Sequence, residues 1–351
     1  MGILSATEIL KQVKTVWQVD EKVAEEVENG FIWWPGNHKV QVFCTKSEVE
    51  SDPNGWRLSA ETEFIKDIDL REKAPLIAHM SAFSPTYAWV YTPPEVTKKY
   101  ELPDDGAVSF HSTVYVRPET VDWLPKHFAR LAIMQPIDAQ RMAGTTAQVL
   151  GGVANCSGPR HARGSENGDE ILNVAELIYA PMGKEPSKWV GSAEFAAVAT
   201  QHGKNDMCFG TGDGHGLTLE TPFGNDSALI RLQHDQTHPA LGNGLLTTIQ
   251  LPVSDTMEAT VNTCMQLNYF AAISYTGVPF SGSWHPKERG GRGFLPAYGT
   301  FIPNALYTDL LATNMALWAV GLARWVRHQL WPDLKDLTML EVLNARLRPD
   351  Q

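Results

Sequence analysis

The feature that most constrains the fold is a sequence pattern that occurs twice in the chain. Residues 107–143 contain an aromatic-rich run, a proline, a short turn and then apolar residues at helical spacing, and residues 293–330 show the same order. Placing Pro118 on Pro303 gives an offset of 303 − 118 = 185 residues, which is close to half of the 351 residues. We therefore predict an internal duplication, in which two lobes share one arrangement of elements.

The patterning between these segments predicts an α+β fold. In the first half, an apolar stripe predicts a helix over residues 5–27, with Ser5 and Glu8 forming a capping box at its start. A second helix is expected from about residue 122, after the proline. The expected strands are two short ones within residues 31–44, on either side of Pro-Gly-Asn, and residues 56–68, 86–91 and 108–116.

The second half shows the same mixture of periods. The expected helices are residues 173–179, 192–201, 255–270 and 309–330, and the expected strands are residues 207–223, 228–251, 273–284 and 293–302. Residues 37–42 also match residues 214–219 at an offset of 215 − 38 = 177, so we expect them to be equivalent strands. Each lobe is therefore predicted to be a mainly antiparallel sheet with flanking helices, and the two lobes to be related by a pseudo-twofold axis.

Chain length and local composition suggest where the lobes begin and end. A chain of 351 residues exceeds the size at which one hydrophobic core usually keeps growing, so two lobes are expected. We predict a first α+β lobe at residues 1–143, a Gly/Ser-rich linker at 144–170 and a second lobe at 171–330. Residues 331–351 are predicted to contain an amphipathic helix with Leu337, Leu340, Leu343 and Leu347 on one side.

The order of helix, strand pair, middle segment, strand pair and helix resembles the secretion-chaperone-like α/β sandwich, which is the fold of type III secretion chaperones and YbjN-like proteins. In this chain the unit is present twice. The resemblance implies a curved antiparallel sheet with helices on one side, and binding of a protein or peptide instead of catalysis. Because a duplicated lobe imitates a homodimer, we expect a monomer that acts as a pseudo-dimer, with a groove between its lobes.

Charge and cysteine spacing narrow the class of protein further. The formal net charge of −11 disfavours binding to nucleic acid or to an anionic membrane, and the sequence has no uncharged apolar run of membrane-spanning length. The start of the chain has no secretory-signal pattern. The four cysteines are scattered without a CxxC pair, which is typical of free, mostly buried thiols. We therefore expect a cytoplasmic protein.

Catalytic and cofactor motifs are absent from the sequence in recognisable form. The glycine run at residues 210–216 has neither the spacing of a dinucleotide-binding loop nor the Lys-Ser/Thr of a P-loop, and is more typical of a hairpin turn. No GxSxG or HExxH motif occurs, although a triad assembled from distant residues would leave no such trace. We therefore predict no cofactor, and leave catalytic activity open.

Two local clusters are the candidates for a functional site. His234 and His238, with His215 brought near by the fold, are candidate metal ligands of a metal- or anion-dependent enzyme; solvated loop histidines are the alternative. Arg289 and Arg292 flank two glycines, beside Trp284, in a segment that could hold a carboxylate or phosphate of a partner; a flexible hairpin tip is the alternative. The first hypothesis is an enzyme, whereas the second fits the binding or chaperone-like module that we favour.

Overall fold

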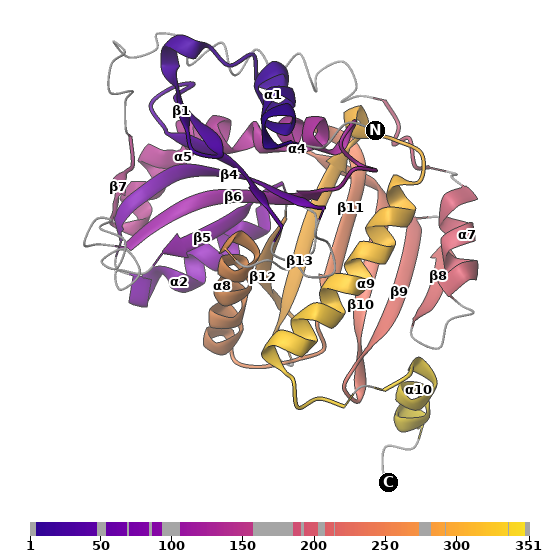
Figure 1. The fold of residues 1–351 in the computed structure, drawn as a ribbon. Helices are drawn as coiled ribbons and strands as arrows, with labels where there is room; N and C mark the ends of the chain where they lie inside the picture. The colour runs from indigo at the N-terminus through magenta and orange to yellow at the C-terminus, as the bar shows by residue number, and fades with distance from the viewer. Residues whose placement is uncertain are drawn as a thin grey trace. The chain divides into compact units, whose positions relative to one another are not determined.

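The computed structural model describes residues 5–47, 54–68, 70–83, 86–92, 106–156, 185–190, 193–202, 208–213, 215–273, 282–291, 293–335 and 337–347. The chain divides into two compact units (Figure 1). Unit 1 comprises Met1–Ile178 and Asn268–Ser283, and unit 2 comprises Tyr179–Leu267 and Trp284–Gln351. None of the helices in the described ranges combines the length and the apolar character needed to cross a membrane.

The sheet of unit 1 is antiparallel, with the strand order β1-β2-β3-β4-β6-β5 and a short β7 paired with β4. Alternation along β3 places Val40, Val42 and Cys44 fully inside, as their spacing predicts. The strands are β1 (Ala24–Val27), β2 (Gly30–Trp33), β3 (Val40–Lys46), β4 (Trp56–Ile68), β5 (Ala88–Thr92), β6 (Gly106–Val116) and β7 (Val153–Ala154).

Helices cover the sheet of unit 1. They are α1 (Ala6–Trp17), α2 (Leu70–Met80), α4 (Leu124–Ala132) and α5 (Met134–Leu150). Helix α1 packs against α4 and β3, α4 packs against β6, and α5 packs against β4. The capping box predicted at Ser5 and Glu8 is present at the start of α1. Pro125 lies in the first turn of α4, where its missing N–H costs least.

A buried polar side chain ties α5 to the sheet of unit 1. Gln135 has no exposed surface, and its amide donates to Thr62 Oγ1 at 3.0 Å and to the Phe110 carbonyl at 3.1 Å. Its oxygen accepts from the hydroxyl and the backbone N–H of Ser112, at 2.7 and 3.0 Å. Each of these polar groups is therefore paired, which is the condition under which a buried amide stabilises a core.

Unit 2 contains a sheet with the strand order β8-β9-β10-β11-β13-β12. Helix α9 packs against the three strands β9, β10 and β11, and helix α7 packs against β8 (Figure 1). The strands are β8 (Phe209–Asp213), β9 (Gly216–Phe223), β10 (Asp226–His238), β11 (Gly242–Gln250), β12 (Ser283–Glu288) and β13 (Phe294–Pro303). The helices are α7 (Ala193–His202), α9 (Leu311–Leu330), α10 (Met339–Leu347) and the first part of α8 (Met257–Ile273), whose residues from Asn268 onward belong to unit 1.

The two units share one topology. In each sheet the first four strands follow one another, and the sixth strand then inserts between the fourth and the fifth. Each sheet has a helix before its first strand, a helix between its fourth and fifth strands, and a helix after its sixth strand. The predicted α+β architecture with two similar lobes is therefore confirmed, and the equivalence of β6 with β13 agrees with the strand-proline-helix pattern.

The first helix is shorter than its apolar spacing predicts. Helix α1 ends at Trp17, because Gln18 adopts a left-handed conformation with φ of 49°. The same apolar stripe placed residues Ala24–Val27 in the helix, but they form β1. This strand pairs with β2, with Ala24 opposite Trp33 and Val27 opposite Gly30. Hydrogen bonds to a strand that follows in the sequence therefore outweigh a helical pattern of apolar residues.

The predicted boundaries and one predicted equivalence also differ from the structure. The linker was expected to begin at residue 144, but α5 continues to Leu150 and ends at Gly151, whose φ is 77°. The helix predicted at 173–179 lies outside the described residues, and Asn268–Ser283 groups with unit 1. By strand order β9 is equivalent to β2, so the alignment of residues 37–42 with 214–219 was one strand out of register.

The C-terminal helix is present, but it buries a different face from the one predicted. Met339 and Val342 are 4% and 0% exposed, whereas Leu340 and Leu343 are 62% and 39% exposed. Arg346 fixes α10 to the β9–β10 hairpin, with hydrogen bonds to Glu220 at 2.9 Å and to Asp226 at 2.6 Å. The leucine spacing therefore predicted the helix, but not which side of it packs.

Candidate functional site

The hairpin between β12 and β13 carries the arginine loop predicted as an anion or partner site. Arg289 is exposed, and its backbone N–H donates to the Gly293 carbonyl at 2.9 Å. Gly290 and Gly291 adopt positive φ angles of 50° and 76°, and open space surrounds the position of a Cβ on either. Arg292 lies outside the described residues. The structure thus describes one arginine at an open hairpin tip, and the two-arginine clamp stays a prediction.

Trp284, the third residue predicted for the anion or partner site, belongs to the core of unit 2 and does not reach the hairpin tip at which Arg289 is exposed. Its side chain is 1% exposed, and its ring centroid lies 5.3 Å from that of Tyr298 on β13. Tyr298 in turn lies 5.6 Å from Trp318 of α9, measured between ring centroids. Alternation along β12 turns Trp284 toward this aromatic cluster, while Lys287 is exposed.

Two of the three candidate metal-ligating histidines are engaged by other groups. His215 is exposed, and its Nδ1 lies 3.1 Å from Oδ2 of Asp235. His234 is 5% exposed, and its ring packs against Phe195 of α7 at a centroid distance of 5.6 Å. His215 thus contacts a carboxylate at the surface and His234 makes a buried ring contact, while Nδ1 of His234 is buried without a hydrogen-bond partner among the described residues.

The third candidate ligand, His238, packs against Phe301 with ring centroids 5.3 Å apart. Its Nδ1 accepts the backbone N–H of Ala240 at 3.2 Å, and burial lowers its pKa below the ordinary value. Across the described part of the chain, no three His, Cys, Asp or Glu side chains lie close enough to hold a metal ion. The metal-dependent alternative therefore gains no support from these residues.

The glycine run forms a hairpin, as predicted. Strand β8 pairs with β9, with Phe209 opposite Glu220 at one end and Asp213 opposite Gly216 at the other. Gly216 has a φ of 148°, and a Cβ at this position would lie 1.9 Å from the carbonyl oxygen of Leu232 on β10. Only glycine allows the two backbones to approach this closely.

The outer edge of β8 is the part of unit 2 that best fits a binding site. Strand β8 is the last strand in the sheet order, so among the described residues its outer backbone groups face no further strand. Gly210 allows α7 to lie close on one side, since a Cβ there would come within 3.2 Å of the Ala199 backbone. On the alternate positions Phe209 is 46% exposed and Thr211 is exposed. An extended segment could therefore continue the sheet beside an apolar ring.

The equivalent edge of unit 1 differs sharply in charge. Strand β1 occupies the same place in its sheet as β8, but carries Glu25 and Glu26, both exposed. Charged side chains along an edge strand disfavour the addition of another strand. Strand β8, in contrast, carries one charged residue, Asp213 at its end, and none over Phe209–Gly212. Within the described residues, the edge of β1 is thus protected by charge, whereas most of the edge of β8 is not.

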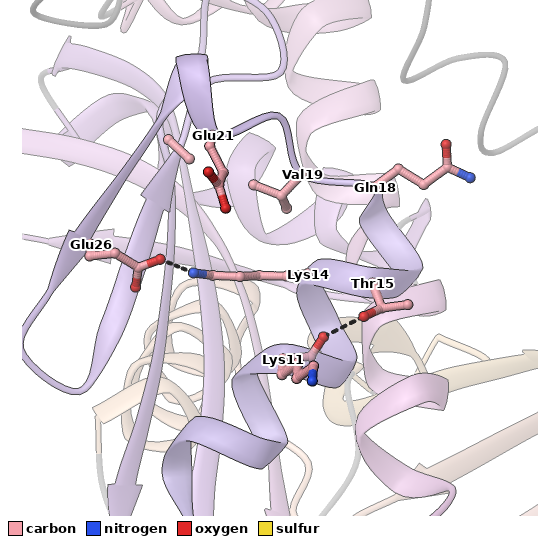
Figure 2. Close-up of a pocket in the computed structure, with 8 residues that line it drawn as sticks. Lys11, Lys14, Thr15, Gln18, Val19, Glu21 and Glu26 are labelled. Atoms are coloured by element: carbon pink, nitrogen blue, oxygen red, sulfur yellow. Dashed lines mark hydrogen bonds and ion pairs between the residues drawn. The ribbon is translucent and has the colours of Figure 1, made fainter.

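A polar hollow of about 430 Å³ lies between α1 and β1 in unit 1 (Figure 2). Lys14 reaches across it from α1 to form an ion pair with Glu26 of β1. Lys11 and Glu21 also line it, and both are exposed. Because charges of both signs meet there in contact with solvent, the hollow lacks the apolar lining that usually binds a small molecule.

Comparison with known proteins adds no assignment. No family model matches the chain, and neither the curated proteins nor the solved structures contain a significant match. The candidate site therefore depends on the residues and contacts described above.

Sequence reasoning missed the β8 edge because exposure of an edge depends on strand order. The segment Phe209–Asp213 was predicted to lie in a strand, but a strand in the centre of a sheet has a similar local pattern. The available signal was its composition: two glycines and a single charged residue, Asp213, distinguish it from the segment Ala24–Val27, which carries two glutamates. This comparison is informative only if β8 is known to be equivalent to β1. The sequence alignment had instead paired residues 37–42 with residues 214–219, and so did not relate these two segments.

Proposed function

We propose that this chain is a binding module that recognises an extended peptide segment of a partner protein by adding it to the edge of β8. The observation that carries the proposal is the contrast between this edge, whose one charged residue is the terminal Asp213, and its counterpart β1, which carries Glu25 and Glu26. Strand addition is a common mode of peptide recognition, in which backbone hydrogen bonds supply affinity and alternate side chains supply specificity. It agrees with the protein- or peptide-binding role implied by the resemblance to secretion chaperones.

The surroundings of β8 indicate the chemistry of the peptide. Phe209 and Thr211 would lie under alternate side chains of an added strand, so an apolar residue opposite Phe209 would bury part of that exposed ring. The net charge of −11 favours a peptide that carries lysine or arginine outside this contact. We also propose that the chain acts in the cytoplasm, because its four cysteines are free thiols, which are typical of a reducing compartment.

Peptide selection and a charge substitution at the edge test the proposal. Peptides selected from a random display library on the wild-type protein are synthesised, and their binding is measured by fluorescence anisotropy. Thr211→Lys places a solvated charge on the edge, and should weaken binding by at least about tenfold, or about 1.4 kcal/mol. Peptides with alternate backbone nitrogens methylated should lose binding as well, because they cannot donate to β8.

The matched control is Leu317→Lys, which adds the same charge to unit 2 at a side chain that is 49% exposed on α9. This variant should bind the selected peptides as the wild type does, and both variants should keep the wild-type melting temperature. Equal binding by Thr211→Lys and wild type would contradict the proposal. Failure of the library to yield any enriched peptide would contradict it too.

A further inference from the structure

Unit 1 contains a cysteine-histidine pair that the proposed function does not use. Cys156 follows β7, and its Sγ lies 4.0 Å from Nε2 of His38, a residue 118 positions earlier in the sequence. The pairing of β7 with β4 holds this position: the Asn155 N–H donates to the Phe64 carbonyl at 2.9 Å, directly before Cys156. The cysteine is exposed, whereas His38 is 3% exposed.

The contact made by Nδ1 of His38 determines which tautomer faces Cys156. Nδ1 lies 3.0 Å from the carbonyl oxygen of Glu63, and a carbonyl can only accept a hydrogen bond. The neutral ring therefore carries its hydrogen on Nδ1, and presents the unprotonated Nε2 toward the thiol. The thiol of Cys156, the imidazole of His38 and the Glu63 carbonyl thus lie next to one another in space as a nucleophile, a base and a group that orients the base. The distance from Sγ to Nε2 must shorten for proton transfer.

Burial and backbone groups set the protonation of this histidine. Burial lowers the pKa of His38, while hydrogen bonds to the Glu63 and Asn155 carbonyls oppose the shift. Because Nδ1 already faces Glu63, the Asn155 carbonyl is placed to accept from Nε2 once that nitrogen is protonated. The neighbouring charges are Glu63, which favours the imidazolium, its ion-pair partner Lys39, and Lys66, which pairs with Val153 in the β4–β7 ladder.

The other three cysteines cannot compete with Cys156 in the folded protein. Cys44, Cys208 and Cys264 are buried, and Cys156 is the exposed member of the four. Burial raises the pKa of Cys44 and of Cys208 to about 12, and that of Cys264 further. A reagent that attacks thiolates should therefore find one target on the folded chain.

We infer that Cys156 is a reactive thiol that undergoes exchange with low-molecular-weight disulfides, with His38 as its proton acceptor. In this reaction the thiol proton passes to Nε2 of His38, and the thiolate attacks one sulfur of the disulfide. The disulfide S–S bond breaks as a new S–S bond to Cys156 forms, and the second sulfur leaves as a thiolate that takes up the proton. The incoming disulfide is the oxidant, and the product is a mixed disulfide on unit 1.

Because the remaining cysteines are buried, no exposed thiol of the same chain can resolve the mixed disulfide. The modification should therefore persist until an external thiol removes it. This behaviour describes a site of reversible S-thiolation. The inference shares no residue with the peptide site, because Cys156 and His38 belong to unit 1 and β8 belongs to unit 2.

The test measures incorporation of oxidised glutathione into the full-length protein by intact-protein mass spectrometry. The wild type should take up one equivalent, and Cys156→Ser should take up none. His38→Asn keeps a donor for the Glu63 carbonyl but removes the base, and should slow the second-order rate near neutral pH by at least about tenfold. The control His127→Asn makes the same change at a histidine of α4, and should react at the wild-type rate.

A second variant keeps the inference testable if His38→Asn fails to fold, which labelling of the buried cysteines would reveal. His38→Gln also carries a side-chain amide that can donate to the Glu63 carbonyl and lacks the base, so a folded His38→Gln protein should react with oxidised glutathione at least about tenfold more slowly than the wild type. A wild-type rate in this folded variant would overturn the inference. An unchanged rate in a folded His38→Asn variant would overturn it as well, because Cys156 would then be merely exposed.

Discussion

Replacing Trp318 with alanine should destabilise unit 2 by about 3–5 kcal/mol. The indole is 9% exposed on α9 and contacts Tyr298 with ring centroids 5.6 Å apart. Burial of a tryptophan removes about 150–250 Å² from water, which at about 25 cal/mol per Å² corresponds to about 4–6 kcal/mol. Residual compactness of the unfolded chain reduces this by about 10–40%, to about 2.4–5.4 kcal/mol. Losses for large aromatic side chains are typically about 3–5 kcal/mol, which narrows the expectation to the stated range.

Equilibrium unfolding in urea, followed by far-ultraviolet circular dichroism, measures this loss. Hydrogen exchange of the α9 amides then shows whether the loss arises in unit 2, since the two units can unfold in separate steps. The matched control is Leu317→Ala, which changes the neighbouring residue at a side chain that is 49% exposed, and should cost less than about 0.5 kcal/mol. A loss below about 1 kcal/mol for Trp318→Ala would refute the assignment of this side chain to the core.

Three further substitutions test other parts of the structure. Gln135→Met should lower the stability of unit 1 by about 1–3 kcal/mol, because it leaves buried hydroxyl and backbone partners unpaired; an unchanged melting temperature would exclude this. Arg346→Met should speed hydrogen exchange in α10 while costing under about 1 kcal/mol overall, since its hydrogen bond to Glu220 is partly solvated; unchanged exchange would contradict that role. Burial raises the pKa of Glu61, but His111, Ser109 and Lys39 together outweigh burial and hold that pKa at about 2. The carboxylate therefore stabilises the fold at pH values above its unfolded pKa of about 4.3, and this contribution disappears as the pH falls toward 2. Glu61→Gln should therefore lower the free energy of unfolding at neutral pH and leave it unchanged in acid. An equal loss of stability at both pH values would refute this.

Local sequence patterns predicted most of the secondary structure. The strand expected at residues 56–68 is β4, Trp56–Ile68, and the closing helix expected at 309–330 is α9, Leu311–Leu330. Alternation and helical spacing succeed in these cases because one face of each element is buried along its whole length. The capping box at Ser5 is likewise a short-range feature, and it formed as predicted.

Strand order and the burial of particular side chains depended on the tertiary structure. Trp284 and Arg289 lie five residues apart in the sequence, but Trp284 packs on Tyr298 and Arg289 is exposed. The segment Ala24–Val27 has helical apolar spacing, yet forms a strand because it pairs with β2. In both cases the decisive contacts join residues that local patterning does not relate.

The sequence by itself therefore determined that this chain contains two similar α+β lobes, since a repeated pattern and the periodicity of apolar residues are properties of short segments. The tertiary structure alone decided which strand forms an open edge, and that β8 corresponds to β1. It also brought Cys156 within 4.0 Å of His38 across 118 residues. Such contacts arise from strand pairing between distant segments, and no spacing within either segment encodes them.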